Sequence, residues 1–374
     1  MVAAVERMAL RGCHPDAILP HTPAIVKPMS RMLEEIRQQP EALEHTLSAA
    51  LRGVEKFKRL VEKQRPRLVV LVARGTSDNA ALFGRYLLEI TTGIPVSLAA
   101  PSITTLYEAH IDYRDSLVVG ISQSGESIDT NLVLERARRQ GALTLGITNE
   151  SGSAMARIAE HVLLVRAGRE KSVAATKTYT GQMLMMYLLA YALGGRVRIA
   201  DLERIPDVVR DTLALEPEVD ALSERYRFMR HAVVVGRGLN YSNAFEMSLK
   251  LMETCYVVAE RFSSADFLHG PIALVEQNFP VFAFAPPGKT WPSIGETLTK
   301  LQALQAEIVA ITDSGNREVE RLATRVIRLP RRVKEILTPI PYIVPAQVFA
   351  ACLAVHKGLD PDKPRTLTKV TLTL

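Results

Sequence analysis

A repeat with a spacing of 163 residues constrains the fold of this chain more than any other feature. Three loops, each of which follows a short apolar run and contains a glycine, recur at this one offset. The matched glycines are Gly75 and Gly238, Gly125 and Gly288, and Gly152 and Gly315. Because one offset recurs at three separate loops, the chain is predicted to contain two copies of the same domain.

Short apolar runs alternate with segments of helical periodicity along both copies. In the first copy, strands are predicted over residues 68–72, 95–98, 117–121, 143–147 and 161–165, and helices over residues 77–91, 129–140, 154–158 and 176–193. The second copy repeats the plan, with apolar runs at residues 231–236, 280–284 and 308–312. This alternation predicts an α/β fold in which each copy is a doubly wound parallel sheet flanked by helices.

Two domains of this kind fit a length of 374 residues. We expect an N-terminal arm and helix over residues 1–45, a first domain over residues 46–205 and a second domain over residues 206–374. Within the arm, several prolines make residues 1–28 irregular, and a long helix is predicted to begin at Pro40, because proline is well tolerated in a first helical turn.

The composition is that of a globular protein, with 47% hydrophobic and 23% charged residues. A net charge of +6 suits an anionic small ligand, but without a basic stripe it gives no reason to expect nucleic acid as a partner. The apolar stretch Met183–Leu193 is too short to span a membrane and predicts a buried helix, so we expect no membrane association.

Cofactor and metal sites are not expected from the sequence. The three cysteines, Cys13, Cys255 and Cys352, have neither disulfide nor zinc-ligand spacing, which favours a reducing, cytoplasmic location. No two histidines have metal-ligand spacing around a glutamate. The segment Gly236-Arg237-Gly238 lacks the third glycine of a dinucleotide-binding loop.

The loop Ser122-Gln123-Ser124-Gly125-Glu126-Ser127 lies between a predicted strand and a predicted helix. Its three serines offer hydroxyl donors, its glycine lets backbone N–H groups approach a ligand, and the helix that follows directs its positive end at the loop. These features indicate a phosphate site. Because this loop lacks the Gly-Lys-Ser/Thr sequence of nucleotide-binding loops, we expect its ligand to be a small phosphoester rather than a nucleotide. The simpler alternative is a polar turn that binds nothing, which is common for isolated short motifs.

The matching loop of the second copy, residues 283–290, fits a loose nucleotide-binding pattern. Pro286 and Pro287 have no backbone N–H, however, and such groups are what cradle a phosphate. We therefore expect one sugar-phosphate site per chain.

The order of motifs along the chain resembles that of tandem sugar isomerase (SIS) domains of the glucosamine-6-phosphate synthase isomerase type. The motifs that carry the resemblance are Arg74-Gly75-Thr76-Ser77, residues 122–127, 172–177 and 246–253, Glu260, His269-Gly270-Pro271, and residues 360–365 and 369–371. The resemblance extends from about residue 30 to the C-terminus. It implies two SIS domains and an ordered C-terminal tail.

The resemblance also implies one phosphosugar site. Phosphate binding is expected of Ser122, Gln123, Ser124 and Ser127, sugar contacts of Thr76 and Ser77, and a border of the site at Val173 and Ala175. The synthase has a serine where Ala175 stands, so the identity of the sugar is left open.

Four catalytic roles follow from the same resemblance. Glu253 is expected to move a proton between C2 and C1, Lys250 to stabilise the charge that develops, His269 to open the sugar ring, and Lys369 to bind the open sugar, as the matching lysine does covalently in the synthase. His269 is expected to reach the site of a neighbouring subunit, which implies a homodimer. Taken alone, these residues also fit an exposed helical Lys–Glu pair, a turn histidine and a solvated tail lysine.

The stand-alone SIS enzymes that this chain most resembles deaminate glucosamine 6-phosphate. About thirty residues precede the first SIS helix and Cys13 is not N-terminal, so glutaminase activity is not expected. The predicted reaction converts glucosamine 6-phosphate and water to fructose 6-phosphate and ammonia. The alternatives are an SIS-type deglycase, another phosphosugar isomerase, or a sugar-phosphate sensor without catalysis, which would not need all four catalytic residues.

Overall fold

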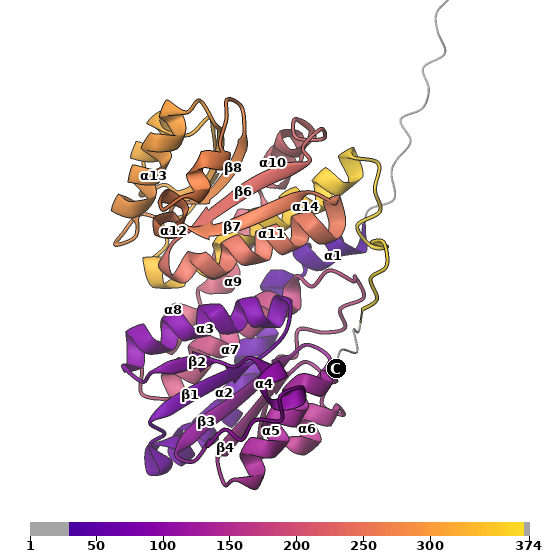
Figure 1. The fold of residues 1–374 in the computed structure, drawn as a ribbon, viewed down its shortest axis with the longest axis vertical. Helices are drawn as coiled ribbons and strands as arrows, with labels where there is room; N and C mark the ends of the chain where they lie inside the picture. Colours follow the sequence, from indigo (N-terminus) through magenta and orange to yellow (C-terminus); the bar gives the residue numbers. More distant parts are fainter. Residues whose placement is uncertain (1–29, 370–374) are drawn as a thin grey trace, which may run out of the picture.

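The computed structural model describes residues 30–369, so the predicted arm over residues 1–28 and the last five residues lie outside the described part. Two lobes each contain a five-stranded sheet (Figure 1). The first sheet consists of β1 (Leu68–Val72), β2 (Val96–Leu98), β3 (Ser116–Ser122), β4 (Leu143–Thr148) and β5 (His161–Leu164). The second consists of β6 (His231–Gly236), β7 (Val258–Ser263), β8 (Pro280–Phe284), β9 (Glu307–Asp313) and β10 (Arg325–Leu329).

The two sheets have the same topology. Their strand orders are β2-β1-β3-β4-β5 and β7-β6-β8-β9-β10, and neighbouring strands are parallel throughout. The register is also repeated: Val70 pairs with Val118, and the residues 163 positions later, Val233 and Val281, pair with each other. The predicted doubly wound α/β fold and its duplication are therefore confirmed, although β7 and β10 had not been predicted.

Helices cover both faces of each sheet. In the first half of the chain they are α1 (Arg31–Arg37), α2 (Gln39–Gln64), α3 (Thr76–Thr92), α4 (Pro101–Thr105), α5 (Ile128–Arg139), α6 (Ala154–Ile158) and α7 (Lys177–Ala192). The connecting helices are α8 (Ile199–Leu202), α9 (Ile205–Leu213) and α10 (Glu216–Glu224). The second half contains α11 (Tyr241–Cys255), α12 (Ser264–Leu268), α13 (Trp291–Ala303) and α14 (Pro339–His356), with short 3₁₀ turns at Gly238–Asn240, Pro271–Leu274, Glu318–Arg321 and Glu335–Leu337. The domain boundaries expected after residues 45 and 205 stay predictions.

Two apolar helices at equivalent positions form the centre of the molecule. In α7 every residue except Tyr191 is buried, as expected for a helix without a polar face. Of the described helices, α14 alone is long and apolar enough to cross a membrane by length and composition, but 89% of it is buried inside the protein. One hydrophobic cluster includes both helices and extends through both domains. We interpret α14 as a core helix.

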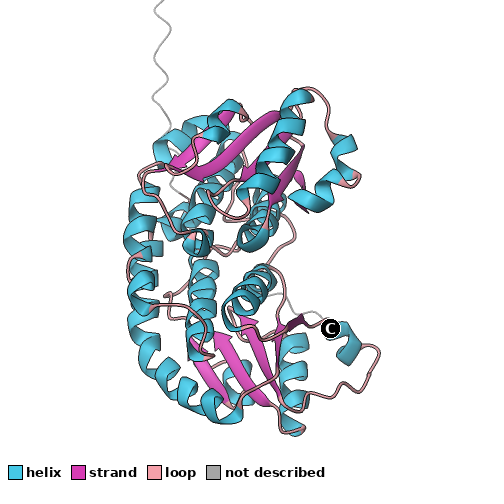
Figure 2. Cartoon of the chain, turned by 90° about the vertical axis from the view of Figure 1, so that its left-hand side faces the viewer, coloured by secondary structure: helices cyan, strands magenta, loops and turns pink. Residues whose placement is uncertain are grey.

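Helices lie between the two sheets and join the lobes (Figure 2). Helix α3 of the first domain packs against α11 of the second. Buried hydrogen bonds cross this boundary: the Asn79 amide donates to Glu246 Oε2 over 2.7 Å, and the Gln39 amide donates to Gln347 Oε1 over 2.8 Å. Because α11 lies beside α3, side chains from the second domain can reach the carboxyl ends of strands in the first.

The first sheet reverses its winding between β1 and β3, which are neighbours in the sheet but not in sequence. In doubly wound sheets, ligands bind outside the carboxyl ends of the strands at such a switch point. The loops that leave β1 and β3 there are residues 73–75 and 123–127, the two motifs singled out from the sequence.

Candidate functional site

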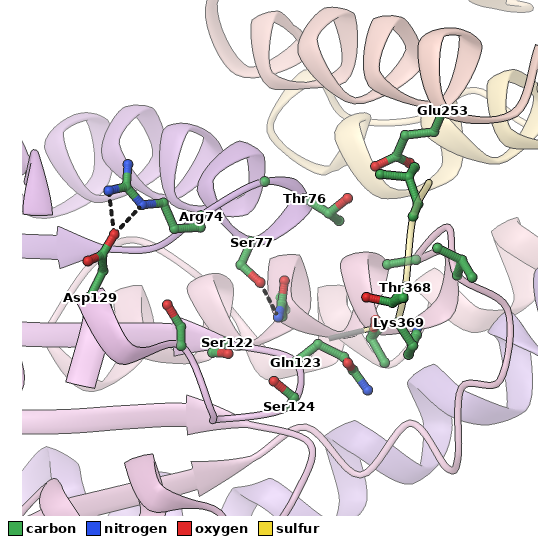
Figure 3. A pocket seen from close by; sticks show the side chains of 17 residues that line it. Arg74, Thr76, Ser77, Ser122, Gln123, Ser124, Asp129, Glu253, Thr368 and Lys369 are labelled. Atoms are coloured by element: carbon green, nitrogen blue, oxygen red, sulfur yellow. Dashed lines mark hydrogen bonds and ion pairs between the residues drawn. The ribbon is translucent and has the colours of Figure 1, made fainter. Parts of the chain in front are cut away.

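A cavity of about 550 Å³ opens at the carboxyl ends of β1 and β3 (Figure 3). Five segments that are distant in sequence line it: the loops after β1 and β3, the residues around the start of α7, helix α11 and the C-terminal tail. The lining residues are Arg74, Gly75, Thr76, Ser77, Ser122, Gln123, Ser124, Ser127, Asp129, Val173, Ala175, Thr178, Gln182, Glu253, Leu367, Thr368 and Lys369.

The loop after β3 is a rigid turn. Gly125 has a φ of +67°, and a Cβ there would lie 2.2 Å from Ser153 Oγ, so only glycine fits. The Gly125 N–H donates to Ser122 Oγ over 3.1 Å, and the Asn131 amide donates to the Gly125 carbonyl over 3.0 Å. Ser127 then occupies the N-cap position of α5. The turn thus holds several hydroxyls beside the positive end of a twelve-residue helix, an arrangement that suits an anion.

The second domain holds an internal anion at the matching turn. The carboxylate of Glu335 accepts hydrogen bonds from the Lys289 N–H over 2.8 Å, the Thr290 N–H over 3.0 Å and the Thr290 hydroxyl over 2.9 Å. The residue 163 positions before Glu335 is Ser172, which carries no charge. A protein carboxylate therefore occupies the second cradle. That the chain has one phosphate site stays a prediction.

Helix α11 contributes a buried lysine and two carboxylates. The side chain of Lys250 is only 1% exposed, and its Nζ donates to Glu253 Oε2 over 2.6 Å and to Thr76 Oγ1 over 3.2 Å. Glu246, which is fully buried, lies 3.4 Å from the same Nζ. Burial alone would lower the pKa of Lys250, but the charges of Glu246 and Glu253 outweigh burial and raise it. Lys250 therefore remains a cation and is not part of a solvated surface pair.

Glu253 is the member of this group that reaches the cavity. Its side chain is 24% exposed and lines the cavity on the side opposite Ser122, Gln123 and Ser124 (Figure 3). Lys250 is not a lining residue and touches the site through Glu253 and Thr76. A carboxylate that faces a cavity with a buried ammonium group behind it has the arrangement of a general base with a fixed electrostatic partner.

The C-terminal tail brings Lys369 to the same cavity. Lys369 Nζ donates to Glu170 Oε2 over 2.8 Å, and Glu170 is fully buried. The Glu170 carboxylate also accepts from the Thr176 N–H and from the N–H and hydroxyl of Thr178. Burial raises the pKa of Glu170, but Lys369 and these hydrogen bonds outweigh burial and lower it. Sequence reasoning missed Glu170, because nothing in its surroundings marks it as a partner of the tail.

Two further contacts hold the tail in its path. The Asp362 carboxylate accepts from the backbone N–H groups of Arg31 and Met32, at the start of α1, over 2.7 and 2.9 Å. The Arg365 guanidinium lies 4.4 Å from the centre of the Tyr256 ring, and the Arg365 N–H donates to the Tyr256 hydroxyl over 2.8 Å. Lys369 is thus at the end of an anchored segment.

His269 lies elsewhere. It follows α12, its side chain is exposed, and it does not line the cavity of its own chain. Its expected role in the site of a neighbouring subunit remains a prediction.

The other expected site residues line the cavity: Thr76, Ser77, Ser127, Val173 and Ala175. The buried Gln182 amide donates to Ser77 Oγ over 2.9 Å. Within residues 30–369, no group of three or more His, Cys, Asp or Glu side chains could hold a metal ion.

Comparison with known proteins agrees with this architecture. Residues 63–192 and 227–357 each match the profile of the SIS domain. The chain belongs to the SIS domain family. The two SIS domains correspond to the two sheets, and the cavity lies at the switch point of the first.

The relatives of this SIS protein include larger enzymes. The protein named glutamine–fructose-6-phosphate aminotransferase [isomerizing] from Pyrococcus horikoshii is 37% identical over 345 residues, which is 90% of this chain and 57% of that relative. The enzyme of the same name from Thermus thermophilus is 37% identical over 351 residues, with 90% and 58% covered. The chain thus spans less than two thirds of the length of these relatives.

Solved structures match most of this chain. The C-terminal domain of glucosamine-fructose-6-phosphate aminotransferase from Francisella tularensis superposes with a TM-score of 0.80 at 30% identity, covering 89% of this chain and 98% of that one. Glucosamine-6-phosphate deaminase from Thermotoga maritima superposes with a TM-score of 0.71 at 21% identity, covering 92% and 100%, which shows a shared fold. This SIS protein is therefore related to the isomerase part of the aminotransferase.

Proposed function

We propose that this protein is an aminosugar-phosphate isomerase and deaminase that converts glucosamine 6-phosphate and water to fructose 6-phosphate and ammonia, without glutamine. One observation carries the proposal: the anion cradle after β3, Glu253 and Lys369 line a single cavity, and the buried Lys250 donates to Glu253. The chain covers little more than half of its aminotransferase relatives, so their whole activity is not transferred to it.

The geometry suggests a role for each group. The phosphate of the open-chain sugar would bind Ser122, Gln123, Ser124 and Ser127, which directs C1 and C2 across the cavity toward Glu253. Glu253 would take the proton from C2 and return it to C1. This converts the 2-amino aldehyde to the imine of fructose 6-phosphate, and water then releases ammonia from the imine.

Lys250 would act by its charge. Negative charge develops on the C1 oxygen when the C2 proton leaves, and a buried ammonium group nearby stabilises that charge without reorganisation of water. Lys369 donates to Glu170 in this arrangement, which favours a role in binding the sugar and closing the cavity.

The ring-opening group is proposed to come from a second copy of the chain. His269 carries an imidazole, a common acid–base group in catalysis, but it does not line the cavity of its own chain. A homodimer in which His269 completes the neighbouring site would supply it. We further propose that this dimer is cytoplasmic, where phosphorylated sugars are available, and that it works without cofactor, nucleic acid or membrane.

The test is a coupled measurement of both products. Purified protein is given glucosamine 6-phosphate without glutamine, and ammonia and fructose 6-phosphate are quantified together. Equal release of both supports the proposal. Binding of the sugar phosphate without turnover would favour a sensor, and no binding would refute the phosphosugar site altogether.

A second candidate is a phosphosugar isomerase or deglycase acting on a different sugar. Ala175 favours it, because this lining residue offers no hydroxyl where the synthase has a serine. In the same assay, this candidate is distinguished by isomerisation of a sugar phosphate, or by release of an amino acid, with no ammonia from glucosamine 6-phosphate.

A further inference from the structure

Arg74 lines the cavity that contains the proposed phosphate cradle, and the proposed mechanism gives it no role. It follows β1 and lines the cavity with a side chain that is 49% exposed. Its Nη2 and Nε donate over 2.6 and 3.2 Å to the same oxygen, Oδ2 of Asp129 (Figure 3). A guanidinium group carries five N–H donors, so this contact leaves donors for a ligand.

Asp129 is an unusual residue to find beside a phosphate. It lies in the first turn of α5, is 1% exposed, and lines the same cavity. Its second oxygen, Oδ1, is buried and has no hydrogen-bond partner among the described residues. A carboxylate in this position repels a phosphate dianion, and repulsion is strong where water is excluded.

A second acidic residue also interacts with Arg74. Asp78 lies in the first turn of α3, the other helix that begins at the switch point. Partial desolvation raises the pKa of Asp78, and the positive charge of Arg74 opposes that rise. Arg74 therefore acts electrostatically on two carboxylates, Asp129 in the cavity and Asp78 at the start of α3.

We propose that Arg74 is the residue that makes this pocket specific for phosphorylated sugars, because it cancels the charge of Asp129 and donates its remaining N–H groups to the phosphate. The inference rests on the proposed function, which requires a phosphosugar in the cavity. It assigns to Arg74 a role in binding and none in the movement of protons.

The experiment compares four variants with the parent protein: Arg74→Met, Arg74→Lys, Asp129→Asn and the double variant Arg74→Met/Asp129→Asn. Binding of fructose 6-phosphate and of unphosphorylated fructose is measured by calorimetry, and the fold is checked by thermal unfolding. Arg74→Met should weaken binding of fructose 6-phosphate about 10- to 100-fold, the loss that accompanies a charge-assisted hydrogen bond, and leave fructose binding unchanged. In turnover, the loss should appear in KM rather than in kcat.

The double variant tests the charge argument. With Asp129 neutral, the cradle no longer needs a counter-charge, so the double variant should regain about tenfold of the affinity lost in Arg74→Met. Arg74→Lys, which keeps the charge but not the planar fork, should fall between the parent and Arg74→Met. Equal binding by Arg74→Met and the parent, or no recovery in the double variant, overturns the proposal.

Asp129→Asn keeps the test decisive if Arg74→Met does not fold. If the ion pair serves only to support α5, Asp129→Asn weakens phosphosugar binding; if it serves charge balance, Asp129→Asn binds fructose 6-phosphate at least as tightly as the parent. A parent protein that binds no fructose 6-phosphate refutes the proposed function instead, so the two failures are distinguishable.

Discussion

The buried Lys250 is the best place to test whether the site is held by electrostatics, because its loss should destabilise the protein in a pH-dependent way. Lys250 lies between Glu253 and the fully buried Glu246, which also accepts from the Asn79 amide. Lys250→Met keeps the volume but leaves a buried carboxylate without its cation. Breaking a buried ion pair in this way costs about 3–5 kcal/mol in the free energy of unfolding.

The sign of the pH dependence follows from Glu246. Burial raises the pKa of Glu246 and Lys250 opposes the rise, so the pKa rises further when Lys250 is removed. A carboxyl group with a raised pKa in the folded state stabilises the fold at pH below its unfolded value and loses that contribution as the pH increases through the folded value. The deficit of Lys250→Met should therefore be largest near pH 8 and shrink toward pH 5.

The assay is urea unfolding followed by circular dichroism at several pH values. Lys300→Met is a matched control, since Lys300 forms an exposed pair with Glu296 on α13 over 2.8 Å, and its loss should cost no more than about 0.5 kcal/mol. Adding Glu246→Gln to Lys250→Met should restore much of the stability but not turnover. If Lys250→Met costs no more than Lys300→Met, the reasoning from buried charge is wrong.

Three further predictions concern the general base Glu253, the anion cradle after β3 and the matching turn of the second domain, which Glu335 occupies. Glu253→Gln should bind fructose 6-phosphate as the parent does but lose turnover by at least about 100-fold, measured by ammonia release, because it removes only the base. Gly125→Ala should abolish phosphosugar binding, since its Cβ would lie 2.2 Å from Ser153 Oγ. Gly141→Ala is the control: Gly141 has a φ of +80° and open space around it, so this change should lower the free energy of unfolding by about 1–2 kcal/mol and leave binding unchanged. Glu335→Ala removes three hydrogen bonds at the closed second cradle and should lower the free energy of unfolding by about 1–3 kcal/mol, measured by urea unfolding, without changing turnover.

The repeat made most of the fold predictable, and the exceptions have physical causes. The edge strands β7 and β10 were missed because charged residues such as Glu260 and Arg325 interrupt their apolar pattern. The 163-residue offset applied to β2 and β5 would have located both. Helix α14 repeats α7 at the same offset. Like α7 it has no polar face, so its sequence is that of a core helix and not of a surface helix.

The site was predictable where motifs are continuous and not where partners are distant. The serines after β3 could be assigned from one loop, but Glu170 is paired with Lys369 across 199 residues. Gln182 lines the cavity from an apolar helix, and Asp129 is hidden in an ordinary helical turn. Such residues acquire their roles from tertiary packing, for which a single sequence carries no local signal.

The duplication explains why the site needs both domains. In the first domain, the cradle is open and the matching position, 172, is an uncharged serine; in the second, Glu335 occupies the cradle. The second domain instead contributes Lys250 and Glu253, because α11 lies against α3 and Glu246 bonds to Asn79 across the boundary. The same buried network that orients Glu253 thus joins the domains, so we expect a change that loosens the α3–α11 contact to reduce turnover before it weakens phosphate binding.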